Sequence, residues 1–259
     1  MPETIDLKGT FDTAAGLYDK FRPGYADEIY QKLFSWIPLG PTSKAVEVGP
    51  GTGQATLPVL RTGCQVTAIE YGENFSQICR EKFKDFPSFS VLTGKFEEAS
   101  LEEGAYDLVY SATAFHWIPE EIGYSKAFSL LKSGGVFARF ANHPTPNKEN
   151  QALADEIDRL YKIYMNAPHP AEFGEEDARA LSQIPLRYGF SEVSHALYHR
   201  TRTFSAREYL SLLGTYSDHI ALEEEKRRGL FSGIEQAIQR HGGTITLYDT
   251  MDLELARKP

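Results

Sequence analysis

The sequence feature that most constrains the fold is a short apolar run that leads directly into three closely spaced glycines. Residues 45–48 read Ala-Val-Glu-Val, and residues 49–53 read Gly-Pro-Gly-Thr-Gly. Residues 54–60 follow with a pattern that allows a helix despite Pro58. Glycine reaches backbone angles closed to other residues and lets a ligand approach the main chain. The pattern predicts a strand, a tight turn, and a helix whose first N–H groups point at a ligand.

The spacing of the glycines separates two kinds of nucleotide site. A dinucleotide fingerprint reads G-x-G-x-x-G, whereas here the third glycine comes one residue early and Gln54 takes its place. An acidic residue also stands two positions before the first glycine, so the order E-x-G-x-G-x-G resembles the first motif of class I S-adenosylmethionine-dependent methyltransferases. The other interpretation is an ordinary strand–helix turn without a ligand. The resemblance assigns the following residues to cofactor binding: Glu47, Gly49, Pro50, Gly51 and Gly53.

An acidic residue ends the second expected strand, residues 65–70. Glu70 stands 21 positions after Gly49. A carboxylate at this place in an open sheet accepts hydrogen bonds from both ribose hydroxyls of an adenosine. The alternative role is a helix cap or an exposed acid. Tyr71 follows directly, and we expect its ring to lie against the adenine.

The exit of the third expected strand, residues 88–92, is less typical of the family. Lys95 stands where the resembling family often carries an aspartate. We therefore expect Phe96 to supply a stacking or edge contact to the adenine, with Glu97 near the exocyclic amine. The alternative for Glu97 is a solvated turn.

The string D-L-V-Y-S-A-x-A-x-H-W, which begins in the fourth expected strand, closely resembles the fourth motif of the same family. The resemblance implies that this loop lines the methyl-transfer site. Small residues at Ser111 and Ala112 let the backbone approach the methionine end of the cofactor. His116 and Trp117 are then expected beside the transferred methyl group, with His116 as the first candidate base. The alternative for the His-Trp pair is packing.

Two further segments resemble small-molecule methyltransferases of the trans-aconitate methyltransferase group. The first is Y-D-K-F-R-P-G-Y, where Tyr18 and Arg22 are four apart and share one face of a helix. We expect both to cover the methionine end of the cofactor, unless the arm only packs on the domain. The second is L-L-G-T-Y-S-D-H, which places Tyr216 and His219 on the acceptor side.

Five strand–helix units followed by two later strands predict an α/β fold with an open, doubly wound, mostly parallel sheet. The resemblance implies seven strands, the last one antiparallel, and a helical cap built from insertions. We expect one domain over residues 1–259. Its expected parts are the arm and first helix at 1–43, the cofactor-binding core at 44–143, the mostly helical cap at 144–190 and 205–241, and the final strands at 191–204 and 243–257.

Composition narrows the range of functions. A net charge of −9 argues against a non-specific nucleic-acid binder, which usually shows a basic surface. The start of the sequence lacks a signal-peptide pattern, and no apolar run reaches membrane-spanning length, so we expect a cytoplasmic protein without membrane contact. Cys64 and Cys79 lack metal-type spacing, so no metal site is expected.

These features favour an enzyme that transfers a methyl group from S-adenosylmethionine to a small molecule and releases S-adenosylhomocysteine. A carboxylic acid is one candidate acceptor, with Arg22, Arg139 or His219 as the cation that binds it. Two alternatives stay open: a nicotinamide-dependent oxidoreductase on a related sheet, and a module that binds a nucleoside without turnover. The sequence leaves the oligomeric state undecided.

Overall fold

The computed structural model describes residue 22 and residues 24–146, 149–166 and 172–259. They form two compact units. The sheet unit comprises the described parts of Pro23–Asn142, Gly174–Tyr198 and Met251–Pro259. The helical unit comprises Arg22 and the described parts of His143–Phe173 and His199–Thr250.

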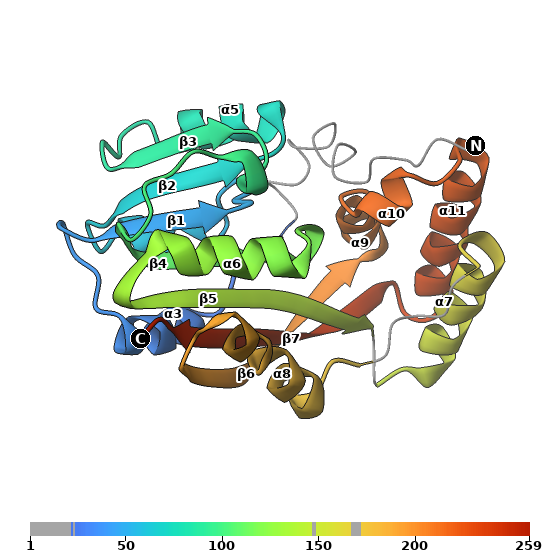
Figure 1. Cartoon of the computed structure of the whole chain (residues 1–259). Helices are drawn as coiled ribbons and strands as arrows, with labels where there is room; N and C mark the ends of the chain where they lie inside the picture. The colour runs from blue at the N-terminus through green and yellow to red at the C-terminus, as the bar shows by residue number, and fades with distance from the viewer. Residues whose placement is uncertain (1–21, 23, 147–148, 167–171) are drawn as a thin grey trace, which may run out of the picture. The chain divides into compact units, whose positions relative to one another are not determined.

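Seven strands form one sheet in the order β3-β2-β1-β4-β5-β7-β6 (Figure 1). The pairs β1–β2, β1–β4, β2–β3 and β4–β5 are parallel. The N–H of Lys258, just after β7, donates to the carbonyl of Gly135 near the start of β5, so these two strands run in opposite directions. The predicted doubly wound, mostly parallel sheet is thus confirmed. The strands are β1 Lys44–Val48, β2 Gln65–Glu70, β3 Phe89–Thr93, β4 Tyr106–Ala112, β5 Leu131–Pro146, β6 Glu192–Ser205 and β7 Thr244–Arg257.

The α-helices of the described residues are α3 Asp27–Trp36, α4 Thr56–Leu60, α5 Glu73–Lys82, α6 Glu120–Leu130, α7 Gln151–Tyr164, α8 Glu175–Ser182, α9 Ala206–Leu213, α10 Ser217–Ile220 and α11 Glu224–Arg240. Three short 3₁₀ helices are η1 Phe96–Glu98, η2 Phe115–Trp117 and η3 Ile184–Tyr188. The helix after the glycine turn is shorter than the predicted 54–60, because residues 51–55 remain in turn conformation.

The core of the sheet unit lies on both faces of the sheet. One cluster joins Ile29 and Leu33 of α3 to Val59 of α4 and Cys79 of α5. The other packs side chains of α6 and the ring of Phe137 against the opposite face. Side chains alternate along a strand, so β1 contributes Ala45 to the first cluster and Val46 and Val48 to the second. Helices on both faces leave the strand ends as the places where a ligand is expected.

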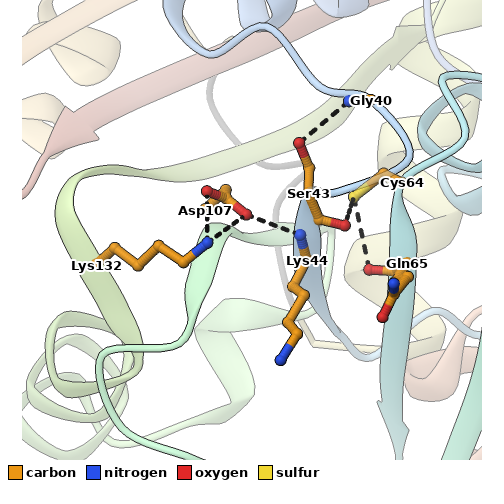
Figure 2. A network of polar contacts seen from close by, with 7 residues as sticks. All are labelled: Gly40, Ser43, Lys44, Cys64, Gln65, Asp107 and Lys132. Atoms are coloured by element: carbon orange, nitrogen blue, oxygen red, sulfur yellow. Dashed lines mark hydrogen bonds and ion pairs between the residues drawn. The ribbon is translucent and has the colours of Figure 1, made fainter.

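The amino ends of the central strands are joined by the polar network of Figure 2. The Asp107 carboxylate accepts the N–H of Lys44 at 2.8 Å and the ammonium of Lys132 at 2.9 Å. The buried Cys64 thiol donates to the carbonyl of Ser43 at 3.3 Å. Burial and, to a smaller extent, the charge of Asp107 raise the pKa of the Cys64 thiol to about 12. Cys64 is therefore a neutral core group.

The helical unit has its own core, in which α11 packs closely on α7. A Cβ on Gly229 would lie 2.5 Å from the ring of Tyr164, and one on Gly233 would lie 2.7 Å from Leu160. These two glycines, four positions apart on one helix face, let the two helices approach. Other members of this core are Leu153, Ile157, Leu212, Leu230 and Ile234.

Glu47 is a fully buried carboxylate in the middle of β1. Its Oε2 accepts the hydroxyl of Thr56 at 2.7 Å and that of Tyr110 at 2.9 Å, and its Oε1 has no hydrogen-bond partner among the described residues. Burial raises the pKa of Glu47 to about 7, against the two hydrogen bonds, and the nearby Glu70 adds to the rise. Folding therefore favours the protonated form of Glu47.

Replacing Glu47 by glutamine tests this burial. The folded-state pKa lies above the ordinary value of 4.5, so the folded protein binds the extra proton between the two values and loses stability as pH rises through that window. Relative to the parent protein, Glu47→Gln should gain stability between about pH 5 and about pH 8, by up to roughly 3 kcal/mol. Urea unfolding of both proteins across this range measures the difference.

Glu97→Gln is the matched control, because it makes the same change of charge at an incompletely buried position. Other buried carboxylates titrate in parent and variant alike and cancel in the comparison. A stability difference between Glu47→Gln and the parent that stays constant with pH would contradict the buried, proton-binding carboxylate.

Candidate functional site

The glycine turn after β1 adopts backbone angles that favour glycine. Gly49, Gly51 and Gly53 have φ values of +66°, +60° and +82°. A Cβ on Gly49 would lie 2.5 Å from the Cβ of Ala114, and one on Gly53 would lie 2.3 Å from the Phe83 ring. The turn is thus held between the loop after β4 and helix α5, and Pro50 lies between its first two glycines.

Glu47 supports this turn from inside the core. Its bond to the Thr56 hydroxyl connects β1 to the first residue of α4 across the whole turn. Glu47 has no exposed surface, and in this structure it supports the turn through that bond. Its expected contact with the cofactor stays a prediction.

Glu70, at the end of β2, points back at the glycine turn. Its Oε2 accepts the N–H of Gly51, and its Oε1 accepts the N–H of Gly72, each at 2.9 Å. The residue is 6% exposed. These bonds fix the plane of the carboxylate, and a carboxylate oxygen accepts more than one hydrogen bond. The carboxylate expected to hold the ribose is thus oriented by the turn expected to bind another part of the cofactor.

The residues predicted to contact adenine differ in their exposure to solvent. Tyr71 is 40% exposed, as a ring that meets a ligand requires. Phe96 is 3% exposed and packs in the core, with the ammonium of Lys126 over its ring at 5.3 Å. The core therefore encloses most of the Phe96 ring, and the predicted stacking or edge contact of this ring with adenine stays a prediction. Glu97 is half-buried on η1, and its carbonyl accepts a bond from Lys126. Lys95 pairs with Glu98 at the surface.

The end of β4 lies against the glycine turn. The buried Ser111 hydroxyl donates to the carbonyl of Val48 at 2.8 Å, which ties β4 to the last residue of β1. Ala112 is half-buried at the strand end. Thr113 then takes a φ of +54°, and Ala114 reaches Gly49. Small side chains here keep the two strand ends in contact.

His116 and Trp117 lie on η2, which is anchored by its first residue. Phe115 is buried between Tyr124 and Phe137, with ring centroids 5.0 and 4.9 Å away. His116 is exposed and Trp117 half-buried, and their rings lie 4.9 Å apart. The buried Phe115 ring therefore fixes the turn that carries His116 and Trp117 just beyond the end of β4.

The remaining predicted residues belong to the helical unit. Arg22 donates to the hydroxyl and the carbonyl of Thr215, at 3.0 and 3.2 Å, and its guanidinium lies 4.2 Å from the centre of the Tyr216 ring. His219 is 2% exposed and bonded to Asp218 and to the hydroxyl of Tyr161. Their roles toward cofactor and acceptor stay predictions. Tyr18 lies outside the described residues.

Of the three candidate cations for a carboxylate acceptor, two are engaged in buried internal contacts. Arg139 donates to Glu254 at 2.9 Å, and Glu254 is 1% exposed. His219 is enclosed by its two partners. Arg139 is the weaker candidate of the two, since withdrawing it would leave a buried carboxylate without its cation.

The sheet unit therefore brings together the glycine turn, Glu70 and the segment from Ser111 to Trp117. All lie at the carboxyl ends of β1, β2 and β4, where the strand order reverses and open α/β sheets bind ligands. No local signal in the sequence indicates the positive φ of Thr113 or its contact with Tyr25, which spans 88 positions. Across the described ranges, no cluster of potential metal ligands is present. None of the helices described is long and apolar enough to cross a membrane.

The chain is similar in sequence to known methyltransferases. A methyltransferase domain family matches residues 46–139. A methyltransferase-like protein of Schizosaccharomyces pombe is 22% identical over 100% of this chain and 99% of its own length. Trans-aconitate 2-methyltransferase of Deinococcus radiodurans is 27% identical over 41% of this chain and 40% of its own length.

Solved structures match across nearly the whole chain. A protein assigned as a type II methyltransferase from Anaeromyxobacter dehalogenans has a TM-score of 0.67 at 21% identity, over 92% of this chain and 98% of that one. Phosphoethanolamine N-methyltransferase 2 of Haemonchus contortus, in complex with phosphomonomethylethanolamine and S-adenosylhomocysteine, has a TM-score of 0.57 at 15% identity, over 100% of this chain and 61% of that one. Together with the glycine turn and Glu70, the family match over residues 46–139 and the methyltransferase relatives support a class I S-adenosylmethionine-dependent methyltransferase, and the solved structures show the shared fold.

Proposed function

We propose that this methyltransferase acts on a small molecule, with carboxylic acids as the first acceptor class to test. The observation that carries the proposal is the pair of bonds by which Glu70 orders the glycine turn at Gly51 and the start of α5 at Gly72, together with the exposed His116 on η2. The net charge of −9 disfavours a nucleic-acid acceptor. The similarity to trans-aconitate 2-methyltransferase supports a small acid.

S-adenosylmethionine supplies a methyl group on a sulfonium, whose leaving group is a neutral thioether. The protein has mainly to align the acceptor with that methyl group, so orientation supplies most of the rate. In this proposal Glu70 holds the ribose and Tyr71 covers the adenine. Glu97 meets the exocyclic amine. The turn from Gly49 to Gly53 and the backbone at Ser111 and Ala112 receive the methionine end.

The acceptor class decides what His116 does. A carboxylate acceptor is already ionised at neutral pH and needs no base. A phenol or an ammonium acceptor must lose a proton, and His116 is then the base. Trp117 lines the acceptor site in both cases.

We also propose that residues of the helical unit contribute to binding, with Tyr216 and His219 acting toward the acceptor and Arg22 toward the methionine end of the cofactor. The bonds of His219 to Asp218 and to Tyr161 would fix its ring.

The direct test is a transfer screen with methyl-labelled S-adenosylmethionine against carboxylic acids, phenols and amines, with protein lacking the Glu70 carboxylate as the blank. Labelled methyl ester from an acid supports the proposal. Label transferred only to amines or only to a macromolecule would contradict the proposed acceptor class.

Glu70→Gln should weaken S-adenosylmethionine binding by at least about tenfold, since one charge-assisted hydrogen bond is worth roughly 1.5–3 kcal/mol. Titration calorimetry measures the affinity. Glu73→Gln is the matched control, because it removes the same charge three residues away on the exposed first turn of α5. Equal affinities for the two variants would remove Glu70 from the cofactor site.

His116→Ala separates the acceptor classes. With a carboxylic acid, kcat should stay within about threefold of the parent value, because no proton has to be removed. With a phenol or an amine, kcat should fall by about a hundredfold or more, and the rise of kcat/KM with pH should disappear. Steady-state rates of both proteins between about pH 5.5 and about pH 8.5 distinguish these outcomes. A hundredfold loss of kcat with the carboxylic acid would refute methyl transfer to that acid without a base.

A further inference from the structure

Thr113, at the exit of β4, has an unusual backbone. Its φ is +54°, and Asn166 is the other non-glycine residue with positive φ in the described part of the chain. Asparagine tolerates this region, whereas a β-branched residue there is a genuine outlier. Strain of this kind persists only where the surroundings hold it, and it gathers at functional sites.

Two contacts hold Thr113 in this conformation. Its N–H donates to the carbonyl of Phe140 on β5 at 2.8 Å. Its hydroxyl is bonded to the hydroxyl of Tyr25 at 2.6 Å. The Tyr25 ring in turn packs edge-on against the Phe140 ring, with centroids 4.8 Å apart and planes at 88°. Tyr25, two residues before α3, thus contacts both Thr113 and Phe140, whose carbonyl on β5 accepts the Thr113 N–H.

The strained residue sets the course of the chain that follows it. Ala114 comes next, and its Cβ occupies the space that a side chain on Gly49 would need. The 3₁₀ turn with His116 and Trp117 begins one residue later. A change of φ at Thr113 would redirect Ala114 away from the glycine turn and would turn His116 and Trp117 away from the strand end.

We propose that Tyr25 is a positioning residue for methyl transfer. Its hydroxyl holds Thr113 in the left-handed conformation, and this keeps Ala114 against Gly49 and presents His116 and Trp117 to the acceptor. The inference rests on the proposed function for its effect on turnover, but its effect on the turn does not depend on any ligand. In this proposal Tyr25 acts on the turn through Thr113.

The competing explanation is packing alone. Tyr25→Phe separates the two, because phenylalanine keeps the ring against Phe140 and removes only the hydroxyl. Thr113→Val removes the other partner of the bond and keeps the β-branched shape. Thr113→Ser keeps the hydroxyl and serves as the conservative variant.

The first readout needs no ligand. The chain has two tryptophans, Trp36 and Trp117, so a Trp36→Phe background leaves Trp117 as the sole reporter of the turn. In this background Tyr25→Phe and Thr113→Val should each raise the acrylamide quenching of Trp117 by about twofold, and Thr113→Ser should stay near the parent value. Thermal unfolding and circular dichroism confirm that each variant is folded.

The second readout is turnover with the acceptor found in the transfer screen. Tyr25→Phe should lower kcat by about tenfold, with the KM for S-adenosylmethionine within about twofold, because the bond acts on alignment and not on cofactor binding. The double variant Tyr25→Phe/Thr113→Val should lose no more than either single variant, as for two partners of one bond.

Additive losses in the double variant, or parent-like quenching of Trp117 in folded Tyr25→Phe, would overturn the proposal. If the parent protein fails to methylate small molecules, the proposed function fails, while the quenching comparison still decides the role of Tyr25.

Discussion

The hydrogen bond from the Gly51 N–H to the Glu70 carboxylate is the contact on which the site depends. It joins the turn after β1 to the end of β2, in addition to the backbone ladder between these two strands. The second oxygen of Glu70 holds the N–H of Gly72 at the start of α5. One carboxylate therefore orients two loops at the carboxyl edge of the sheet. Its own plane is fixed in return, so the acid is preorganised before a nucleoside arrives.

The carboxylates of Glu47 and Glu70 have different roles at this edge of the sheet. Glu47 is enclosed below the turn and connects β1 to α4 through the Thr56 hydroxyl. Glu70 lies at the end of β2, where the ribose is expected. Burial raises the pKa of Glu47 to about 7, so Glu47 carries less negative charge under the turn than an ordinary carboxylate does near neutral pH, while Glu70 orders the amides.

The parts of the site that follow local rules were predictable from sequence. The three glycines and the acid at the end of β2 have fixed spacing, and the structure brings Gly51 and Glu70 into contact. The burial of the Phe96 ring was not predictable, since a lone aromatic after a turn does not show which way it points. The helix after the turn was predicted too long, since residues 51–55 stay in turn conformation. The bond between Tyr25 and Thr113 spans 88 positions and leaves no periodic pattern.

A crystal structure of the protein with S-adenosylhomocysteine tests the central claim most directly, namely that the nucleoside lies between the glycine turn and Glu70. The account predicts both ribose hydroxyls within hydrogen-bond distance, about 2.5–3.0 Å, of the Glu70 carboxylate, with the homocysteine part along the turn from Gly49 to Gly53. A nucleoside bound elsewhere, or one at this edge that makes no contact with Glu70, would contradict it.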